Sequence, residues 1–219
     1  TVRYAFNRHA KPPLPRTSTH RAAAVTAAAQ EVTADDLPLL GEPLAVELAN
    51  SLYVGGETVD FLATPARVLL WLRTATVKRN VHVPARFSLE DVARLQELRG
   101  AVRVLLDGIA AATAPASDAV RTVNRFASAA PSYARLEPIA GGGYAAVTTE
   151  SAGTVDGLLG RLAHETIVLV GSSNGALVRR CEAAGCPMFF IKHHHRRRWC
   201  HESCGHRTRQ AAYERRKFS

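Results

Sequence analysis

Four cysteines, the only ones in the chain, lie within 24 residues of one another. They are Cys181, Cys186, Cys200 and Cys204, spaced as C-x4-C, thirteen residues, and C-x3-C. Two short cysteine loops brought together form the tetrahedral thiolate cage that zinc prefers, and all four positions are then filled. The alternatives are a redox dithiol or unpaired thiols, because disulfides are disfavoured in a reducing cytoplasm. The spacing predicts one structural Zn²⁺ ion, with no open position for catalysis.

Basic and aromatic side chains surround the predicted cage. Residues 188–191 (MFFI) have the pattern of a short strand, and residues 192–199 (KHHHRRRW) lead into the second cysteine pair. A helix is expected over 202–216, with Cys204 in its first turn, so the metal would fix the position and direction of this helix. Arg209, Tyr213 and Arg216 stand at i, i+4 and i+7 and share one stripe of it.

This combination is typical of a nucleic-acid-binding module, which needs guanidinium groups for phosphates or base edges and a flat aromatic side chain for stacking. The expected contacts are Arg196, Arg197, Arg198, Arg207, Arg209, Arg216 and Lys217. Three alternatives stay open. Trp199 could pack beside the zinc site instead of stacking on a base. Arg207 could bond to the knuckle's own backbone or to a neighbouring acid. Residues His193–His195 are expected to add pH-dependent charge and not to bind metal, since neighbours on a strand alternate faces.

Charge is distributed unevenly along the chain, whose net charge is +9. Residues 1–21 carry five basic and no acidic side chains, residues 22–177 have a net charge of −4, and residues 178–219 have a net charge of +8. An acidic body with two basic ends indicates a polyanionic partner, because lysine and arginine displace condensed counterions from phosphates. Solvated tails are the alternative.

The remaining sequence predicts an α+β protein: a mostly helical body with a small β-hairpin, followed by a small four-Cys zinc finger made of a knuckle and a helix. The expected divisions are a basic extended arm with a short helix over 1–36, a helical domain over 37–175, and the finger over 176–219. Thr64 before Pro65, and Ser88 three residues before Asp91, are helix-start signals. Helices are also expected over 117–129 and 154–170. Residues 44–52 fit either a helix or a strand.

The predicted β-hairpin joins strands over 135–139 and 144–148 through Gly141–Gly143. A phosphate-binding loop is the weaker interpretation of this glycine triplet, because no lysine-serine pair or helix start follows it. Nucleophile-elbow, Walker and HExxH motifs are also absent from the sequence, so we expect no enzyme activity and no catalytic residue. No apolar stretch approaches the roughly 20 residues that a membrane span needs, and a cytoplasmic protein is expected.

At the C-terminal end, the residues resemble the CGNR zinc finger. The resemblance rests on the Cys181–Cys186 spacing, the Phe189-Phe190 pair, residues 197–200 (RRWC) and residues 204–207 (CGHR), in which His206 stands at the name-giving asparagine. Residues 43–50 (PLAVELAN) and 60–66 (DFLATPA) look like the ABATE domain that usually precedes this finger. The resemblance implies a stress-linked transcription regulator.

The expected function is that of a zinc-dependent nucleic-acid-binding regulator whose body senses a ligand or holds a protein partner. The sequence does not settle whether the nucleic acid is DNA or RNA. A ribosome- or rRNA-associated stress factor that uses the finger and the basic N-terminal arm is one alternative, and a protein-docking zinc module is another. A single finger offers an interface of only about 600–1,000 Å², so binding to a specific operator would require a dimer or a second contact.

Overall fold

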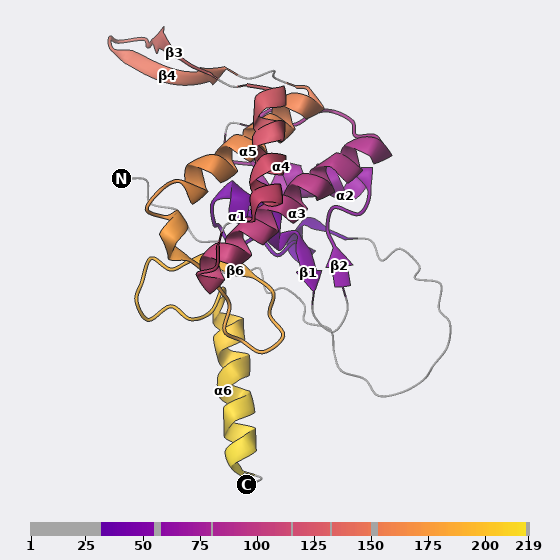
Figure 1. Ribbon diagram of the computed structural model, residues 1–219, viewed down its shortest axis with the longest axis vertical. Helices are drawn as coiled ribbons and strands as arrows, with labels where there is room; N and C mark the ends of the chain where they lie inside the picture. The colour runs from indigo at the N-terminus through magenta and orange to yellow at the C-terminus, as the bar shows by residue number, and fades with distance from the viewer. Residues whose placement is uncertain are drawn as a thin grey trace.

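The computed structural model describes residues 32–54, 58–79, 81–114, 116–131, 133–149 and 153–217. Most of the described body is helical (Figure 1). Its α-helices are α1 (Leu44–Asn50), α2 (Pro65–Ala75), α3 (Leu89–Ala111), α4 (Ser117–Ala129) and α5 (Val155–Val170), and a 3₁₀ helix, η1 (Ala34–Asp36), precedes them. The long helix α3 runs through the middle, where it contacts α1, α2, α4 and α5. Within the described residues, no helix is both long and apolar enough to cross a membrane.

Two antiparallel hairpins interrupt these helices. Strand β1 (Leu52–Val54) pairs with β2 (Thr58–Asp60), and β3 (Tyr133–Pro138) pairs with β4 (Tyr144–Thr149). A third antiparallel pair, β5 (Val178–Arg180) and β6 (Phe189–Ile191), follows the 3₁₀ helix η2 (Gly175–Leu177), and α6 (Glu202–Lys217) completes the described chain. These elements confirm the predicted α+β class with a helical body, a small hairpin and a terminal finger.

Local capping chemistry explains where the body helices begin. The Thr64 hydroxyl accepts the backbone N–H of Arg67 ahead of α2. Ser88 and Asp91 form the predicted capping box of α3: the Ser88 hydroxyl accepts the Asp91 N–H at 3.1 Å, and the Asp91 carboxylate accepts the Ser88 N–H at 2.8 Å. The helix predicted over 117–129 is confirmed as α4. The open stretch 44–52 divides into helix α1 and the first residue of β1.

The expected N-terminal arm and its alanine-rich helix fall almost entirely within residues 1–31, outside the described residues.

Strand β6 lies between the body and the finger. Phe189 and Ile191 are buried in the main hydrophobic core together with Val178 of β5, whereas Phe190 belongs to a second cluster formed with the cysteines. Alternate residues of a strand face opposite ways, so one three-residue strand serves both cores. The finger, predicted to begin at residue 176, therefore packs directly against the body.

Asn50, which is fully buried at the end of α1, joins the body to the finger. Its side-chain amide donates to the carbonyl of Phe189 at 3.0 Å, and its amide oxygen accepts the Phe189 N–H at 2.9 Å. Both backbone groups of Phe189 on this edge of β6 are thus satisfied by a residue 139 positions away in the chain.

Two buried glutamates form a second connection. The Glu47 carboxylate accepts the backbone N–H groups of Leu40 and Glu42, which holds the loop before α1 in place. Glu42 in turn accepts the Ile191 N–H at 3.1 Å and forms an ion pair with Arg197 of the finger at 2.8 Å. Burial raises the pKa of Glu47 to about 7, against the backbone hydrogen bonds and the nearby Arg79 charge.

Replacing Asn50 with alanine should lower the free energy of unfolding by about 2–4 kcal/mol, because it strands a buried donor and a buried acceptor of Phe189. Urea unfolding followed by circular dichroism would measure the change. Asn124→Ala, at an exposed position of α4, is the matched control and should change stability by less than about 0.5 kcal/mol. A loss for Asn50→Ala as small as that of the control would contradict this role.

Stability should also depend on pH through Glu47. The folded state keeps a proton on Glu47 up to about pH 7, whereas the unfolded chain releases it near 4.5, so folding takes up a proton between these values. The free energy of unfolding should accordingly fall as the pH rises through this window, by up to about 3 kcal/mol relative to Glu47→Gln, which does not titrate. Chemical unfolding of both proteins across the window tests this, and parallel pH curves would rule it out.

Candidate metal centre

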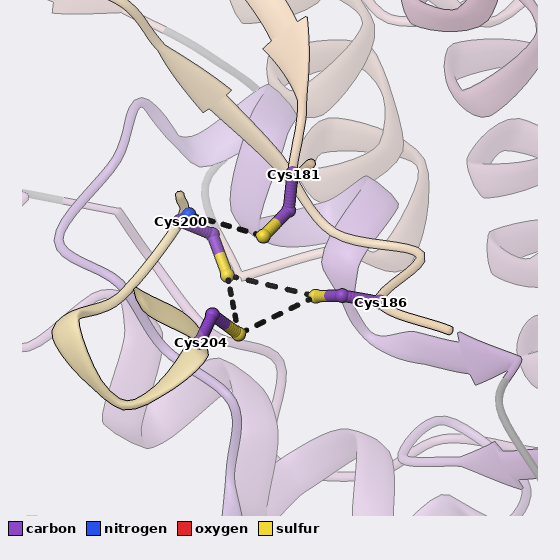
Figure 2. Close-up of side chains that lie close together, drawn as sticks. All are labelled: Cys181, Cys186, Cys200 and Cys204. Carbon is purple, nitrogen blue, oxygen red and sulfur yellow. Dashed lines mark hydrogen bonds between the residues drawn. The ribbon is translucent and has the colours of Figure 1, made fainter. Parts of the chain in front are cut away.

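The four cysteine sulfurs converge on a single point (Figure 2). The Sγ atoms of Cys186, Cys200 and Cys204 are separated by 3.7, 3.7 and 3.8 Å, and all four sulfurs lie within 4.8 Å of one another. A tetrahedron with Zn–S bonds of about 2.3 Å has S–S edges of about 3.8 Å, whereas a disulfide requires about 2.05 Å. The spacing therefore fits four thiolates around one metal ion and does not fit disulfides.

Backbone hydrogen bonds place each sulfur. The Cys181 N–H donates to the Met188 carbonyl at 2.8 Å, which closes the first knuckle, and the Cys200 N–H donates to the Cys181 sulfur at 3.4 Å. The Cys204 N–H donates to the His201 carbonyl at the start of α6. Hydrogen bonds to a sulfur stabilise its negative charge, so the local backbone favours the thiolate form that a metal requires.

Crowding perturbs the ionisation of the four thiols. The sulfur of Cys181 and the burial of the site raise the pKa of Cys186 and of Cys200. The pKa of Cys181 is lowered because the other thiols donate hydrogen bonds to its sulfur. Four thiolates cannot share so small a volume without a counter-charge, and a divalent cation is the counter-charge that these four donors fit.

Gly205 allows α6 to approach the rest of the finger closely. A Cβ atom at this position would lie 2.8 Å from the Trp199 ring, so the ring packs directly on the helix backbone. Trp199 is half-buried against the cysteine cluster, and the Arg209 guanidinium lies 5.6 Å from the centre of its ring. The structure thus places Trp199 in the packing beside the cage, which was the alternative to base stacking.

Arg197 faces inward, unlike the phosphate contact expected from the sequence. Its guanidinium donates to the carbonyls of Ile191 at 3.1 Å and Cys200 at 2.9 Å, lies 4.6 Å from the centre of the Phe190 ring, and pairs with Glu42. These bonds occupy all of its nitrogen atoms, with Nε directed at the Trp199 carbonyl. Arg197 therefore connects the cage to the body, and each of its three nitrogen atoms already has a partner within the protein.

Arg207 also turns toward the cage. It donates to the Ala184 carbonyl at 3.3 Å and lies 3.9 Å from the Cys204 sulfur, and it interacts with the hydroxyl of Tyr53 on β1. A guanidinium at this position offsets part of the negative charge that four thiolates leave around a divalent ion. The bond from Arg207 to the Ala184 carbonyl is the backbone contact that the sequence offered as the alternative to a phosphate contact.

The remaining predicted contacts are exposed. Arg196 and Arg198 lie in the loop before Cys200, where Arg198 pairs with Glu182 at 2.5 Å. Arg209, Arg216 and Lys217 are exposed on α6, as is Tyr213, and the spacing of Arg209, Tyr213 and Arg216 puts them on one stripe. Opposite this stripe, Cys204 and Arg207 face the cage, so the basic stripe faces solvent.

The histidine run stays outside the metal site. His193, His194 and His195 are exposed, and the rings of His194 and His195 stack at 4.6 Å. Within the described residues, the only group of three or more His, Cys, Asp or Glu side chains close enough to share a metal is the four cysteines. The contribution of the histidine run to surface charge stays a prediction.

Sequence reasoning missed the residues that anchor the finger, Glu42 and Asn50. One signal was present: residues 189–191 are apolar on both faces of a strand, a pattern typical of a strand buried on both sides.

Comparison with known proteins identifies both parts of the chain. Residues 42–173 match the ABATE family model, described as "Putative stress-induced transcription regulator", and residues 178–217 match the CGNR zinc finger. No curated protein matches the chain. The first match covers more than half of the sequence, and the second contains all four cysteines of the cage. The chain therefore belongs to the ABATE family and carries a CGNR zinc finger after its ABATE domain.

Proposed function

We propose that this protein is a zinc-dependent, non-enzymatic regulator of transcription that binds duplex DNA through α6. The observation that carries the proposal is the placement of α6: the cage holds its first turn, and the rest of the helix projects from the molecule (Figure 1). Of its sixteen residues only Cys204 and Gly205 are buried. A polar helix of about 24 Å that is held at one end is suited to inserting into a ligand's groove.

The side chains along the exposed stripe support a nucleic-acid ligand. Arg209 and Arg216 flank Tyr213 and offer charge-assisted hydrogen bonds to phosphate oxygens. Gln210, which is also exposed, can pair with an adenine edge but bonds to Glu214 at 2.8 Å in the free protein. A surface with both charged and amide groups can position itself on the backbone and also contact bases.

Duplex DNA fits this element better than RNA. The major groove of B-DNA is about 12 Å wide and admits an α-helix, whereas the major groove of A-form RNA is deep and too narrow for side chains to read.

The ribosome- or rRNA-associated alternative depends on the basic arm within residues 1–31, and the protein-docking alternative depends on an acidic partner. The experiment below distinguishes them.

We expect one zinc ion per chain. Removing it should destabilise the body as well as the finger, because strand β6 belongs both to the main hydrophobic core and to the cluster around the cysteines. Elemental analysis should give one zinc for the native protein and none for Cys200→Ser, whose thermal midpoint should fall. His201→Ala and His206→Ala are matched controls, since these histidines lie beside the ligands in sequence and should retain the metal. Zinc loss in a histidine variant would contradict a four-sulfur site.

Arg209→Ala combined with Arg216→Ala should weaken binding to a duplex of about 20 base pairs. It should also make the slope of log affinity against log salt shallower by about 2, because each of the two lost phosphate contacts contributes about 0.9 to that slope. Fluorescence anisotropy at several salt concentrations would measure both effects.

The control variant is Arg73→Ala with Arg121→Ala, which removes the same charge from exposed positions on the body and should leave the slope unchanged. The same duplex made of RNA provides the second arm. Equal or tighter binding of RNA would favour the RNA-associated alternative, and no binding of either ligand at low salt would refute the proposal.

A further inference from the structure

Helix α6 carries four exposed basic side chains beyond the cage, Arg209, Arg215, Arg216 and Lys217. Contacts from such side chains to phosphates fix the register and orientation of a protein on a duplex, but they carry no sequence information directly. A particular base pair is selected by a side chain whose donors and acceptors match the edge of that pair in the major groove. Sequence selection by α6 therefore depends on which of its side chains offers such a match.

Gln210 is the only residue of 202–217 with a carboxamide side chain. A carboxamide holds a donor NH2 group and an acceptor oxygen side by side, and adenine presents the complementary pair in the major groove, the N7 acceptor and the N6 donor. The serine and threonine hydroxyls of α6 are already bonded within the finger, Ser203 to a histidine ring nitrogen and Thr208 to a backbone carbonyl. Gln210 is therefore the uncharged side chain of α6 best matched to one base.

The position of Gln210 on α6 allows a groove to reach it. The cage holds the helix at Cys204, and Gln210 follows six residues later, about 9 Å further along the axis. Its side chain is exposed, and this part of the helix projects away from the body (Figure 1). Arg209 precedes it by one residue, which places the two side chains about 100° apart around the axis. Arg209 can thus meet the phosphates at one edge of a major groove while Gln210 is turned toward the base edges.

Glu214 fixes the orientation of the Gln210 amide. The Gln210 Nε2 group donates to the Glu214 Oε1 atom at 2.8 Å, one turn further along the helix. A carboxylate only accepts hydrogen bonds, so this contact requires the NH2 side of the amide to be turned toward Glu214. The bond uses one of the two amide hydrogens. The second hydrogen and the amide oxygen have no partner among the described residues, and these two are the groups that an adenine edge requires.

We propose that Gln210 selects an A·T base pair by donating to adenine N7 and accepting from the adenine N6 group, with Glu214 as the residue that positions its amide. The inference rests on the proposed function, because it requires α6 to lie in the major groove of duplex DNA. Guanine presents acceptors at both N7 and O6, so the Gln210 oxygen would face another acceptor there. Replacing the preferred adenine should therefore weaken binding about tenfold, within the range for one bidentate pair.

Selection of binding sites from duplexes with a randomised centre tests the base preference. The zinc-loaded full chain should enrich an A·T pair at one position, and Gln210→Ala should not enrich it. The matched control is Asn124→Ala, which removes an exposed amide from α4 and should enrich the same pair as the wild type. The slope of log affinity against log salt should be the same for all three proteins, because neither substitution removes a charge.

A single-atom change in the DNA separates direct reading of the base from an indirect effect of the substitution. Placing 7-deazaadenine at the selected position removes the N7 acceptor and leaves base pairing intact. Fluorescence anisotropy should show about a tenfold loss of affinity for the wild type and for Asn124→Ala, and a loss of less than about twofold for Gln210→Ala.

Two variants of Glu214 test its positioning role. Glu214→Gln and Glu214→Ala both remove a negative charge, so both should bind any duplex more tightly. Only Glu214→Gln keeps an acceptor oxygen for the Gln210 amide, and it should retain the discrimination against 7-deazaadenine that Glu214→Ala loses in part. Full discrimination by Glu214→Ala would contradict the positioning role.

The outcomes distinguish this inference from the proposed function. A selected site without an adenine preference, or an equal loss on 7-deazaadenine for the wild type and Gln210→Ala, would overturn the role of Gln210. Duplex binding that still depends on Arg209 and Arg216 would in that case leave the proposed function in place. A protein that binds no duplex at low salt would overturn both.

Discussion

The convergence of four sulfurs on one point is the constraint on which the C-terminal part of the molecule depends. The finger buries few apolar side chains of its own besides Met188 and Phe190, so hydrophobic packing alone cannot hold its loops together. The cage joins the knuckle after β5, the loop before Cys200 and the first turn of α6. Since the remaining turns of α6 are not buried, this one attachment sets the direction in which the helix points. Trp199 packed on Gly205 reinforces it, because no other residue at position 205 would allow the ring so close.

The body acts on this centre through a short chain of buried polar contacts. Glu47 holds the loop that carries Glu42, Glu42 pairs with Arg197, and Arg197 bonds to the backbone of Cys200. Buried polar groups are costly unless they are satisfied: the Glu47 carboxyl accepts backbone N–H groups, and the Glu42 carboxylate pairs with the half-buried Arg197 guanidinium. Asn50 provides a parallel connection through β6. The body and the finger are thus joined by two sets of polar contacts, one through Glu42 and Arg197 and one through Asn50.

Features set by neighbours in the sequence were predictable, and features set by distant residues were not. The capping pairs at Thr64 and Ser88, the glycine turn at 141–143 and the cysteine spacing are local signals, and each predicted the element that is found. The inward direction of Arg197 depends on Glu42, which lies more than 150 positions earlier, and a run of three arginines gives no indication of which one turns inward. The amide of Asn50 likewise finds its partner across 139 positions. A single sequence shows composition and periodicity, whereas such pairings arise only when the tertiary fold brings the two segments together.

The distribution of charge agrees with α6 as the end of the molecule that meets a polyanion. Residues 22–177 have a net charge of −4 and residues 178–219 a net charge of +8, so the electrostatic field of the protein attracts a polyanion to the α6 end and repels it from the body. A single α6 helix offers too little surface for specific binding, so recognition of one DNA site would require a second contact besides α6.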